Sequence, residues 1–412
     1  MAARAYDIVL YGASGFVGRQ TVRYMALHAT GLRWALAGRD AAKLEQARAQ
    51  AGPGAREAGI VVADAQDAVA LARLAASGRV VLSTAGPFAL YGTALVDACV
   101  AAGTHYVDIT GETPWVRGLI ERHHASAAHS GTRIVPCCGF DSVPSDIGAW
   151  LVAHALWQQH GEPCASVRAS FTLRGGFNGG TLASALNLME QGQGAALADP
   201  FLLNPAGTRP ADASAHADPI GPHLDADFGA WQAPFFMGPV NTRVVRRSAA
   251  LLQAAGDAAY APQFSYQEYL RFGAGALRGA AAAGFSAGLG ATQLALRFAA
   301  PRALAKRLAP APGAGPSERA MDGGWFRCEL VARSASGNMV RGQLQDQGDP
   351  GNRATTKFVC EAALALACDS ERLPGGAARG GVLTPAVALG AVYAERLRAA
   401  GMTVEPLPQP PA

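Results

Sequence analysis

The chain has 412 residues, of which 50% are hydrophobic and 16% are charged. This length exceeds what a single hydrophobic core usually serves, so we expect at least two domains, and the composition argues against long disordered stretches. The formal net charge of +4 comes from 35 basic and 31 acidic residues without a block of like charge, which argues against a nucleic acid as a partner.

Short apolar runs alternate with helical periodicity between residues 5 and 135. The consecutive apolar residues of these runs are typical of parallel strands that are covered on both faces. We therefore predict a doubly wound α/β sheet of the Rossmann type. The predicted strands are 7–11, 32–37, 59–63, 79–84, 105–109 and 133–137, and the predicted helices are 15–28, 41–50, 67–76, 93–102 and 114–129.

The pattern changes after Pro144, where a second, mixed α/β domain is expected to begin. A helix over 146–159, a strand over 166–173 and a glycine-rich turn over 175–180 are predicted there, and the aperiodic residues 192–240 suggest a long loop or lid. A hairpin of 325–332 with 339–345 and helices over 354–367 and 385–399 follow. The predicted domains are 1–145 (NADP-binding), 146–372 (substrate or dimerisation) and 373–412 (C-terminal helices that return to the Rossmann domain).

The apolar segment 273–300 contains eighteen uncharged residues, from Gly279 to Leu296, close to the length that spans a bilayer. Most of them are Ala and Gly, which gain little from transfer into lipid, so a full span is disfavoured. Glycines spaced four apart allow close helix packing. Two interpretations stay open: a packed or homodimer-forming helix, and an interfacial contact with a membrane.

The most specific motif is the glycine-rich turn 12–18, which follows the first predicted strand and opens a helix. Its Gly-x-x-Gly-x-x-Gly spacing allows a tight turn and a close approach of the backbone to a pyrophosphate, which the helix N-terminus then favours. We expect the dinucleotide to contact Gly12, Ser14, Gly15, Phe16, Val17 and Gly18.

The second strand ends without the acid that would bind the ribose hydroxyls of NAD. Arg39 follows it instead, and Lys43 lies one helical turn further on. A guanidinium can bind a 2′-phosphate with paired charge-assisted hydrogen bonds, so these residues predict NADP(H) as the cofactor. Asp40 is interpreted as a helix N-cap.

Two further strand ends complete the predicted cofactor site. Asp64, after the third strand, either accepts a hydrogen bond from the adenine amino group or caps a helix. The small residues Ala85, Gly86 and Pro87, after the fourth strand, are expected beside the nicotinamide ribose.

A reductase also needs a proton donor, which should lie on a loop at the carboxyl end of a strand. That criterion selects Tyr91, Asp108 with Glu112, and Asp141 with Ser142. Tyr91 could instead pack over the cofactor, and Asp141 with Ser142 could instead form a hinge and a helix cap. The chain contains no Tyr-x-x-x-Lys pair, which disfavours the short-chain dehydrogenases.

Histidines and cysteines give no sign of a metal site. His123, His124 and His129 do not share ligand spacing with an acid or thiol, and a solvated helix face is favoured for them. Cys137 and Cys138 suit packing better than redox chemistry. Seven cysteines without a Cys-x-x-Cys pair favour reduced thiols, and the first residues lack a signal peptide pattern. We expect a cytoplasmic protein, which could also lie peripherally at the inner face of the membrane.

With these motifs the sequence resembles the saccharopine dehydrogenase-like oxidoreductases, and most closely their trans-acting enoyl reductase branch. The resemblance covers nearly the whole chain and is carried by the segments 12–18, 37–39, 83–88, 106–112, 138–146, 348–351 and 380–386. It implies a Rossmann domain, an inserted mixed α/β domain and returning C-terminal helices. It also implies NADPH-dependent reduction of a carbon–carbon double bond in a lipid or polyketide-type intermediate that a synthase carries.

Two alternatives remain. The enzymes that name the family reduce an imine formed from an amino acid, which would require arginines such as Arg168, Arg174 or Arg243 for substrate carboxylates. A non-catalytic scaffold that binds NADP(H) at a membrane surface is the other.

Overall fold

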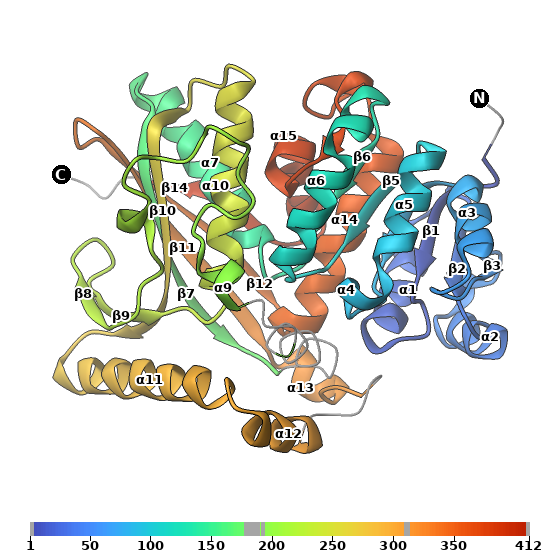
Figure 1. Ribbon diagram of the computed structural model, residues 1–412, viewed down its shortest axis with the longest axis horizontal. Coiled ribbons are helices and arrows are strands. Elements are labelled where there is room, and N and C mark those ends of the chain that lie inside the picture. Colours follow the sequence, from blue (N-terminus) through green and yellow to red (C-terminus); the bar gives the residue numbers. More distant parts are fainter. Residues whose placement is uncertain (1–3, 177–189, 191–193, 309–313, 409–412) are drawn as a thin grey trace.

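Two seven-stranded sheets organise the computed structural model, which describes residues 4–176, 190, 194–308 and 314–408. Figure 1 shows the sheets side by side, with the helices between them and along the outer faces. This arrangement confirms the predicted α/β fold class, a parallel Rossmann sheet combined with a mixed second sheet.

The first sheet is parallel throughout and has the strand order β13-β6-β5-β4-β1-β2-β3. Six of its strands lie where the sequence predicts them. The seventh, β13, was not predicted, because it has only two residues and lies in a turn-rich segment. The strands are β1 (Tyr6–Tyr11), β2 (Trp34–Gly38), β3 (Gly59–Val62), β4 (Gly78–Ser83), β5 (His105–Asp108), β6 (Arg133–Val135) and β13 (Gly381–Val382).

Both faces of this sheet are buried, which explains the consecutive apolar residues of its strands. Along β1, Ile8 and Leu10 join the core beneath α1 (Phe16–His28) and α14 (Thr355–Cys368). Val9 and Tyr11 point to the opposite face, under α3 (Ala68–Ser77), α5 (Thr93–Ala102) and α6 (Thr113–His129). The remaining helices of this part are α2 (Ala41–Gln50), α4 (Phe88–Tyr91) and the short η1 (Pro53–Ala55).

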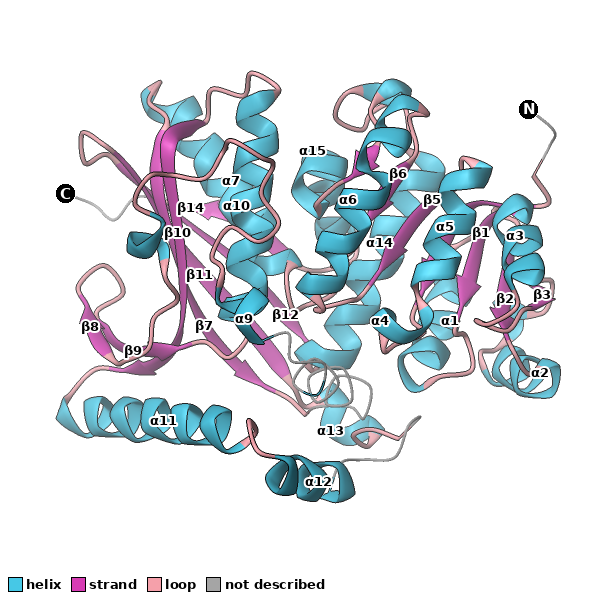
Figure 2. Ribbon diagram, in the orientation of Figure 1, coloured by secondary structure: helices cyan, strands magenta, loops and turns pink. Residues whose placement is uncertain are grey.

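The second sheet has the order β14-β12-β11-β7-β10-β9-β8, and only the pair β7 and β10 is parallel. The predicted hairpin is confirmed as β11 and β12, which turn around Gly337. Figure 2 shows α7 and α10 on the face of this sheet that looks towards the first one. The elements are β7 (Cys164–Arg174), β8 (His223–Asp225), β9 (Ala230–Pro234), β10 (Tyr260–Gly273), β11 (Trp325–Ser334), β12 (Met339–Gln347), β14 (Thr403–Leu407), α7 (Val143–His160) and α10 (Gly238–Ala254).

The prediction of a long loop or lid over 192–240 is wrong for its described part, 194–240. This part contains α9 (Gly194–Ala198), η2 (Ala213–His216), β8, β9 and the start of α10. Arg246 and Arg247 on α10 donate hydrogen bonds to the carbonyls of Pro200 and Leu203. The order of this segment therefore comes from long-range bonds, which leave no local periodicity in the sequence. Of the predicted turn 175–180, residues 177–180 lie outside the described part.

The C-terminal region returns to both sheets. Helix α14 packs on the first sheet, and α15 (Pro385–Ala399) packs against α14 and α7. The predicted return of C-terminal helices is confirmed, and two short strands accompany them, because β13 joins the first sheet and β14 joins the second. The domain boundaries at residues 145 and 372 stay predictions.

The apolar segment 273–300 forms most of α11 (Ala276–Ala295), which is followed by α12 (Ala299–Leu308) and α13 (Glu318–Asp322). Figure 1 shows these three helices along one edge of the molecule. Helix α11 contacts β9 and β10, and Gly279 lies against the Trp231 ring. Within the described ranges, no helix has both the length and the apolar character that crossing a membrane requires.

Candidate functional site

The loop between β1 and α1 is tight enough to require glycine. Gly12 has a φ of +85°, in the left-handed region that glycine favours, and its N–H donates to the Ala37 carbonyl at 2.9 Å. A Cβ atom at position 18 would lie 2.1 Å from the Gly12 carbonyl oxygen. The helix therefore starts directly against the loop, as the motif predicts.

The N-terminus of α1 carries no side-chain cap. Gly15 is the N-cap residue, and the first turn contains no acidic residue. The N–H groups of Phe16, Val17 and Gly18 therefore have no partner within the helix and none from a capping side chain. Together with the helix dipole, they form a site suited to an anion such as a pyrophosphate.

Arg39 extends from the end of β2 into solvent. Among the described residues, no side chain or carbonyl forms an ion pair or hydrogen bond with its guanidinium. Burial raises the pKa of Tyr11 to about 12, the Asp64 carboxylate adds to this rise, and the Arg39 guanidinium opposes it. Both charged groups are thus close to the end of β1 and to the glycine-rich loop.

The residues that follow Arg39 occupy their expected places. Asp40 is confirmed as the N-cap of α2, where its Oδ1 accepts a hydrogen bond from the Lys43 N–H at 3.1 Å. The Lys43 Nζ lies 3.7 Å from Asp40 Oδ2, and both side chains are largely exposed. Asp64 is not the cap of α3, because Asp67 occupies that position. The alternative interpretation of Asp64 as a helix cap is therefore wrong.

The end of β4 meets the glycine-rich loop. The Thr84 hydroxyl donates to the carbonyls of Gly12 at 3.2 Å and Tyr11 at 3.3 Å. Ala85 lies against Gly12, and Gly86 and Pro87 follow directly. The structure therefore brings the three predicted cofactor segments, from β1, β2 and β4, to the same carboxyl edge of the sheet.

Asp108 and Glu112 build this edge and are fully buried. Glu112 accepts hydrogen bonds from the N–H groups of Phe88 at 2.8 Å and Ala89 at 3.0 Å, at the start of α4. Asp108 accepts bonds from Tyr106 and from two backbone N–H groups, and burial raises the pKa of its carboxyl to about 7. These contacts assign both carboxyls to the framework of the edge.

Asp141 and Ser142 follow β6, in the turn that leads into α7. Ser142 is fully buried, and its hydroxyl donates to Asn241 Oδ1 at 3.3 Å. Asp141 is partly buried beside Gly111, and no hydrogen bond or ion pair joins its carboxylate to another described residue. Burial raises the pKa of Asp141 to about 6. Asp141 thus combines a raised carboxyl pKa with the lack of a hydrogen-bonding or ion-pair partner among the described residues.

Tyr91 lies at the end of α4, with 42% of its surface exposed. Glu112 accepts a hydrogen bond from the N–H of Phe88 at the start of the same short helix.

A buried polar network behind Ser142 was missed by the sequence analysis. Asn241 donates to Glu268 Oε1 at 2.8 Å, while Ser145 and Tyr266 donate to Glu268 Oε2 at 2.6 and 2.9 Å. Burial raises the pKa of Glu268 to about 7. The network joins α7 to α10 and β10, and the sequence did not predict the latter two elements; the single acid in the strand Tyr260–Gly273 was the available signal.

The histidines do not converge. His123 is buried and bonded to Asp97 at 2.6 Å, so the prediction of a solvated face is wrong for it, while His124 contacts the Val382 carbonyl at 3.2 Å. In the part of the chain that the structure describes, no three His, Cys, Asp or Glu side chains are placed to hold a metal ion. Cys137 and Cys138 are buried free thiols, as packing requires.

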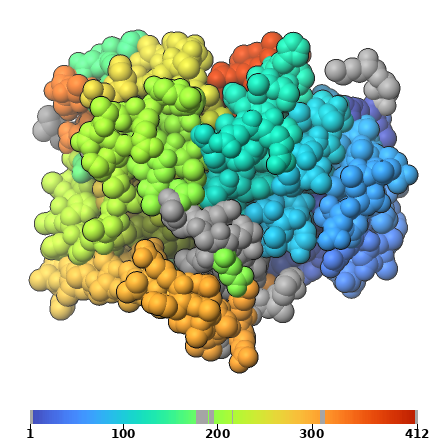
Figure 3. Space-filling model, in the orientation of Figure 1, coloured from blue at the N-terminus to red at the C-terminus, as the bar shows by residue number. Residues whose placement is uncertain are grey.

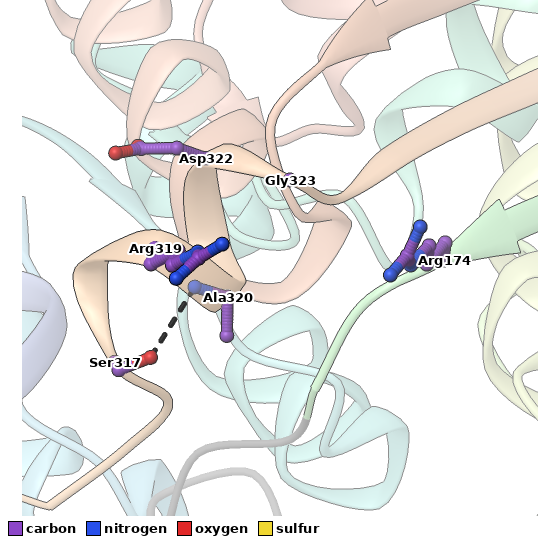
Figure 4. A pocket seen from close by; sticks show the side chains of 6 residues that line it. All are labelled: Arg174, Ser317, Arg319, Ala320, Asp322 and Gly323. Carbon is purple, nitrogen blue, oxygen red and sulfur yellow. Dashed lines mark hydrogen bonds between the residues drawn. The ribbon is translucent and has the colours of Figure 1, made fainter.

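Of the three arginines expected to bind a carboxylate substrate, two form ion pairs with aspartates of the protein itself. Arg168 pairs with Asp225 at 2.6 Å and with Asp227, and buried Arg243 pairs with Asp218 at 2.5 Å. Arg174 lines a pocket of about 820 Å³ together with α13. Figure 4 shows Arg174 and Arg319 on opposite sides of this pocket. No ion pair joins either side chain to another residue of the described ranges.

Both the cofactor domain and the full length of the chain are similar to known proteins. The family model described as the saccharopine dehydrogenase NADP binding domain matches residues 8–135. A protein named trans-acting enoyl reductase from Mycobacterium ulcerans is 37% identical, and one of the same name from Mycobacterium tuberculosis is 35% identical; each alignment covers 98% of both chains.

A further Mycobacterium tuberculosis relative, which carries that name provisionally, is 39% identical over 98% of this chain and 97% of its own. Among solved structures, apo saccharopine dehydrogenase (L-Glu forming) from Saccharomyces cerevisiae aligns over 98% of this chain and 99% of its own. The TM-score is 0.54 at 11% sequence identity, which shows a shared fold.

Proposed function

Because the chain belongs to the saccharopine dehydrogenase-like family, in the branch whose relatives are named trans-acting enoyl reductases, we propose that it reduces a carbon–carbon double bond with NADPH. Family membership identifies it as an NADP-binding oxidoreductase related to enoyl reductases. The finer proposal is a lipid or polyketide-type substrate that a synthase carries. Its support is similarity along the whole chain, since the aligned relatives include the second sheet as well as the cofactor domain.

The observation that carries the proposal is that the α1 N-terminus, which has no side-chain cap, lies near an arginine, Arg39, that has no partner among the described residues. The pyrophosphate would lie on the backbone from Gly12 to Gly18, and the 2′-phosphate on Arg39 with Lys43 beside it. Ala85, Gly86 and Pro87 would flank the nicotinamide ribose, with Asp64 near the adenine. The bound nicotinamide supplies the hydride.

Asp141 is our candidate for the proton donor. Hydride addition to the β-carbon of an enoyl group leaves negative charge on the substrate, and a proton must then reach the α-carbon. A carboxyl whose pKa is raised to about 6 and which has no partner in the described structure can hold that proton. Ser142, whose hydroxyl is bonded to Asn241, would position the turn, and Tyr91 is the second candidate donor.

Turnover with defined substrates tests the proposal. Purified protein is mixed with NADPH and a medium-chain 2-enoyl thioester, and oxidation of NADPH is followed by the loss of its near-ultraviolet absorbance. We expect substrate-dependent oxidation with a saturated thioester as the product. If NADPH binds but no enoyl, imine or carbonyl compound is reduced, the protein is a non-catalytic NADP(H)-binding scaffold and the proposal fails.

Imine reduction on an amino-acid substrate is a second candidate function, favoured by one specific observation. Arg174 and Arg319 face the same pocket without partners in the described ranges, and such a pair can bind a carboxylate. Glutamate and an aldehyde form an imine when they are mixed. NADPH-dependent reduction of this imine by the wild-type protein, and its loss in Arg174→Ala, would support this function. Reduction of enoyl thioesters alone would exclude it.

A further inference from the structure

The segment 276–308, which we call the α11–α12 surface, has an unusual charge. It contains five basic residues and no acidic residue, whereas the whole chain has a net charge of only +4. The rest of the chain is therefore close to neutral, and this one surface accounts for the basic character of the protein. The basic residues are Arg278, Arg297, Arg302, Lys306 and Arg307.

Most of this positive charge is not used within the fold. Lys306 pairs with Glu190 at 2.6 Å, and Arg302 donates to the carbonyls of its own helical region. The side chains of Arg278, Arg297 and Arg307 have no ion pair or hydrogen bond with any residue that the structure describes. Three cations are therefore available to an external anionic partner.

Large apolar side chains are exposed on the same surface. Leu277 is 87% exposed, Leu294 56%, Phe298 62% and Leu304 58%. Only Gly279, Ala282 and Ser286 of α11 are buried, so the helix contacts the second sheet along one stripe and turns its remaining surface outward. Figure 3 shows α11 and α12 as a continuous band along one edge of the molecule.

We propose that the α11–α12 surface docks on an anionic lipid membrane. Arginines beside exposed leucine and phenylalanine match the two layers of a membrane interface, because the cations bind head-group phosphates while the apolar side chains enter the acyl boundary. Docking of a second copy through the same surface would oppose the three unpaired arginines of one copy to those of the other, and residues 276–308 contain no acid to compensate them. Charge complementarity therefore favours lipid over self-association.

Docking would also orient the molecule. Helix α13, which lines the pocket of Arg174 and Arg319, lies along the same edge as α11 and α12 (Figure 1). A membrane on this edge would therefore lie beside that pocket. Binding to lipid requires neither cofactor nor turnover, so the inference stands independently of the proposed reaction.

Sedimentation with vesicles tests the proposal on the full chain. We expect binding to vesicles of equimolar phosphatidylcholine and phosphatidylglycerol, much weaker binding to phosphatidylcholine alone, and loss of binding at high salt. The double variant Arg297→Gln/Arg307→Gln should lower the partition coefficient about 25-fold, because each basic residue near an anionic surface contributes roughly a factor of five.

Two comparisons make this test specific. The matched control Arg56→Gln/Arg73→Gln removes the same charge from exposed positions of the first domain and should retain wild-type binding. Phe298→Ala/Leu304→Ala should weaken binding to the mixed vesicles without changing the net charge.

Three results would overturn the proposal. The first is equal binding of the wild-type protein to both vesicle types, and the second is an equal loss of binding in the control and test variants. The third is a wild-type dimer in sedimentation velocity that dissociates in Phe298→Ala/Leu304→Ala, while neither protein binds vesicles. The last result would assign the surface to a second copy of the chain.

Discussion

Charged side chains behave differently at the carboxyl edge of the first sheet and between the two sheets. At the edge, Arg39 is exposed and has no partner among the described residues. Between the sheets, Arg246 and Arg247 are buried and donate to the carbonyls of Pro200, His216, Tyr266, Leu203 and Val382, and burial lowers the pKa of each guanidinium to about 10.

This difference distinguishes charged side chains that are available to bind a ligand from those that stabilise the fold. A buried arginine whose donors reach backbone carbonyls holds two chain segments together, so its removal should cost stability. An arginine without a partner beside an uncapped helix N-terminus costs the fold little, and its removal should cost affinity. Asp141 lies between these groups, since it is partly buried and yet has no partner in the described structure.

The largest effect is expected for Asp141→Asn. If Asp141 supplies the proton, kcat with an enoyl thioester should fall about 10²- to 10⁴-fold while NADPH affinity stays unchanged. Because the donor must be protonated and its pKa is about 6, wild-type kcat should decline as the pH rises above that value. Steady-state kinetics across pH measure both. A variant with wild-type kcat would transfer the role to Tyr91, which Tyr91→Phe then tests.

Arg247→Met should reduce stability rather than cofactor affinity. The variant leaves the carbonyls of Leu203 and Val382 without their buried donor, which should lower the free energy of unfolding by about 2–4 kcal/mol. Urea unfolding measures this change. Arg56→Met, at an exposed position, is the control and should change stability by less than about 0.5 kcal/mol. Equal stability of both variants would show that burial does not distinguish these arginines.

Arg39→Ala should reduce cofactor affinity rather than stability. Loss of a paired, charge-assisted contact to the 2′-phosphate should weaken NADPH binding about 10- to 100-fold, while NADH affinity and the free energy of unfolding stay close to wild type. Calorimetric titration measures the affinities, with Arg56→Ala as the control. An equal loss for NADH and NADPH would place Arg39 elsewhere than at the 2′-phosphate.

The smallest effect is expected for Lys43→Ala. Its Nζ is exposed and 3.7 Å from Asp40, so it adds a screened charge to the site rather than a fixed bond. We expect a two- to fivefold loss of NADPH affinity, on the order of 0.5–1 kcal/mol, which should disappear at high salt. A loss as large as that of Arg39→Ala would mean that the two residues bind the phosphate equally.

The same contrast explains what could be predicted from the sequence. The glycine-rich turn, the strand ends and Arg39 are local signals, because their function depends on neighbours within a few residues of the chain. Residues 194–240 and the Glu268 network depend on partners far away in sequence, such as Asn241 with Glu268 and Arg246 with Pro200. β13 was missed because it has only two residues in a turn-rich segment, and β14 was missed as a short terminal strand that pairs with β12.

Titration of NADPH and of NADH into the wild-type protein tests the central claim most directly. If the α1 N-terminus holds the pyrophosphate and Arg39 holds the 2′-phosphate, NADPH should bind at least about tenfold more tightly than NADH. Equal affinities, or the absence of heat with either dinucleotide, would contradict the account.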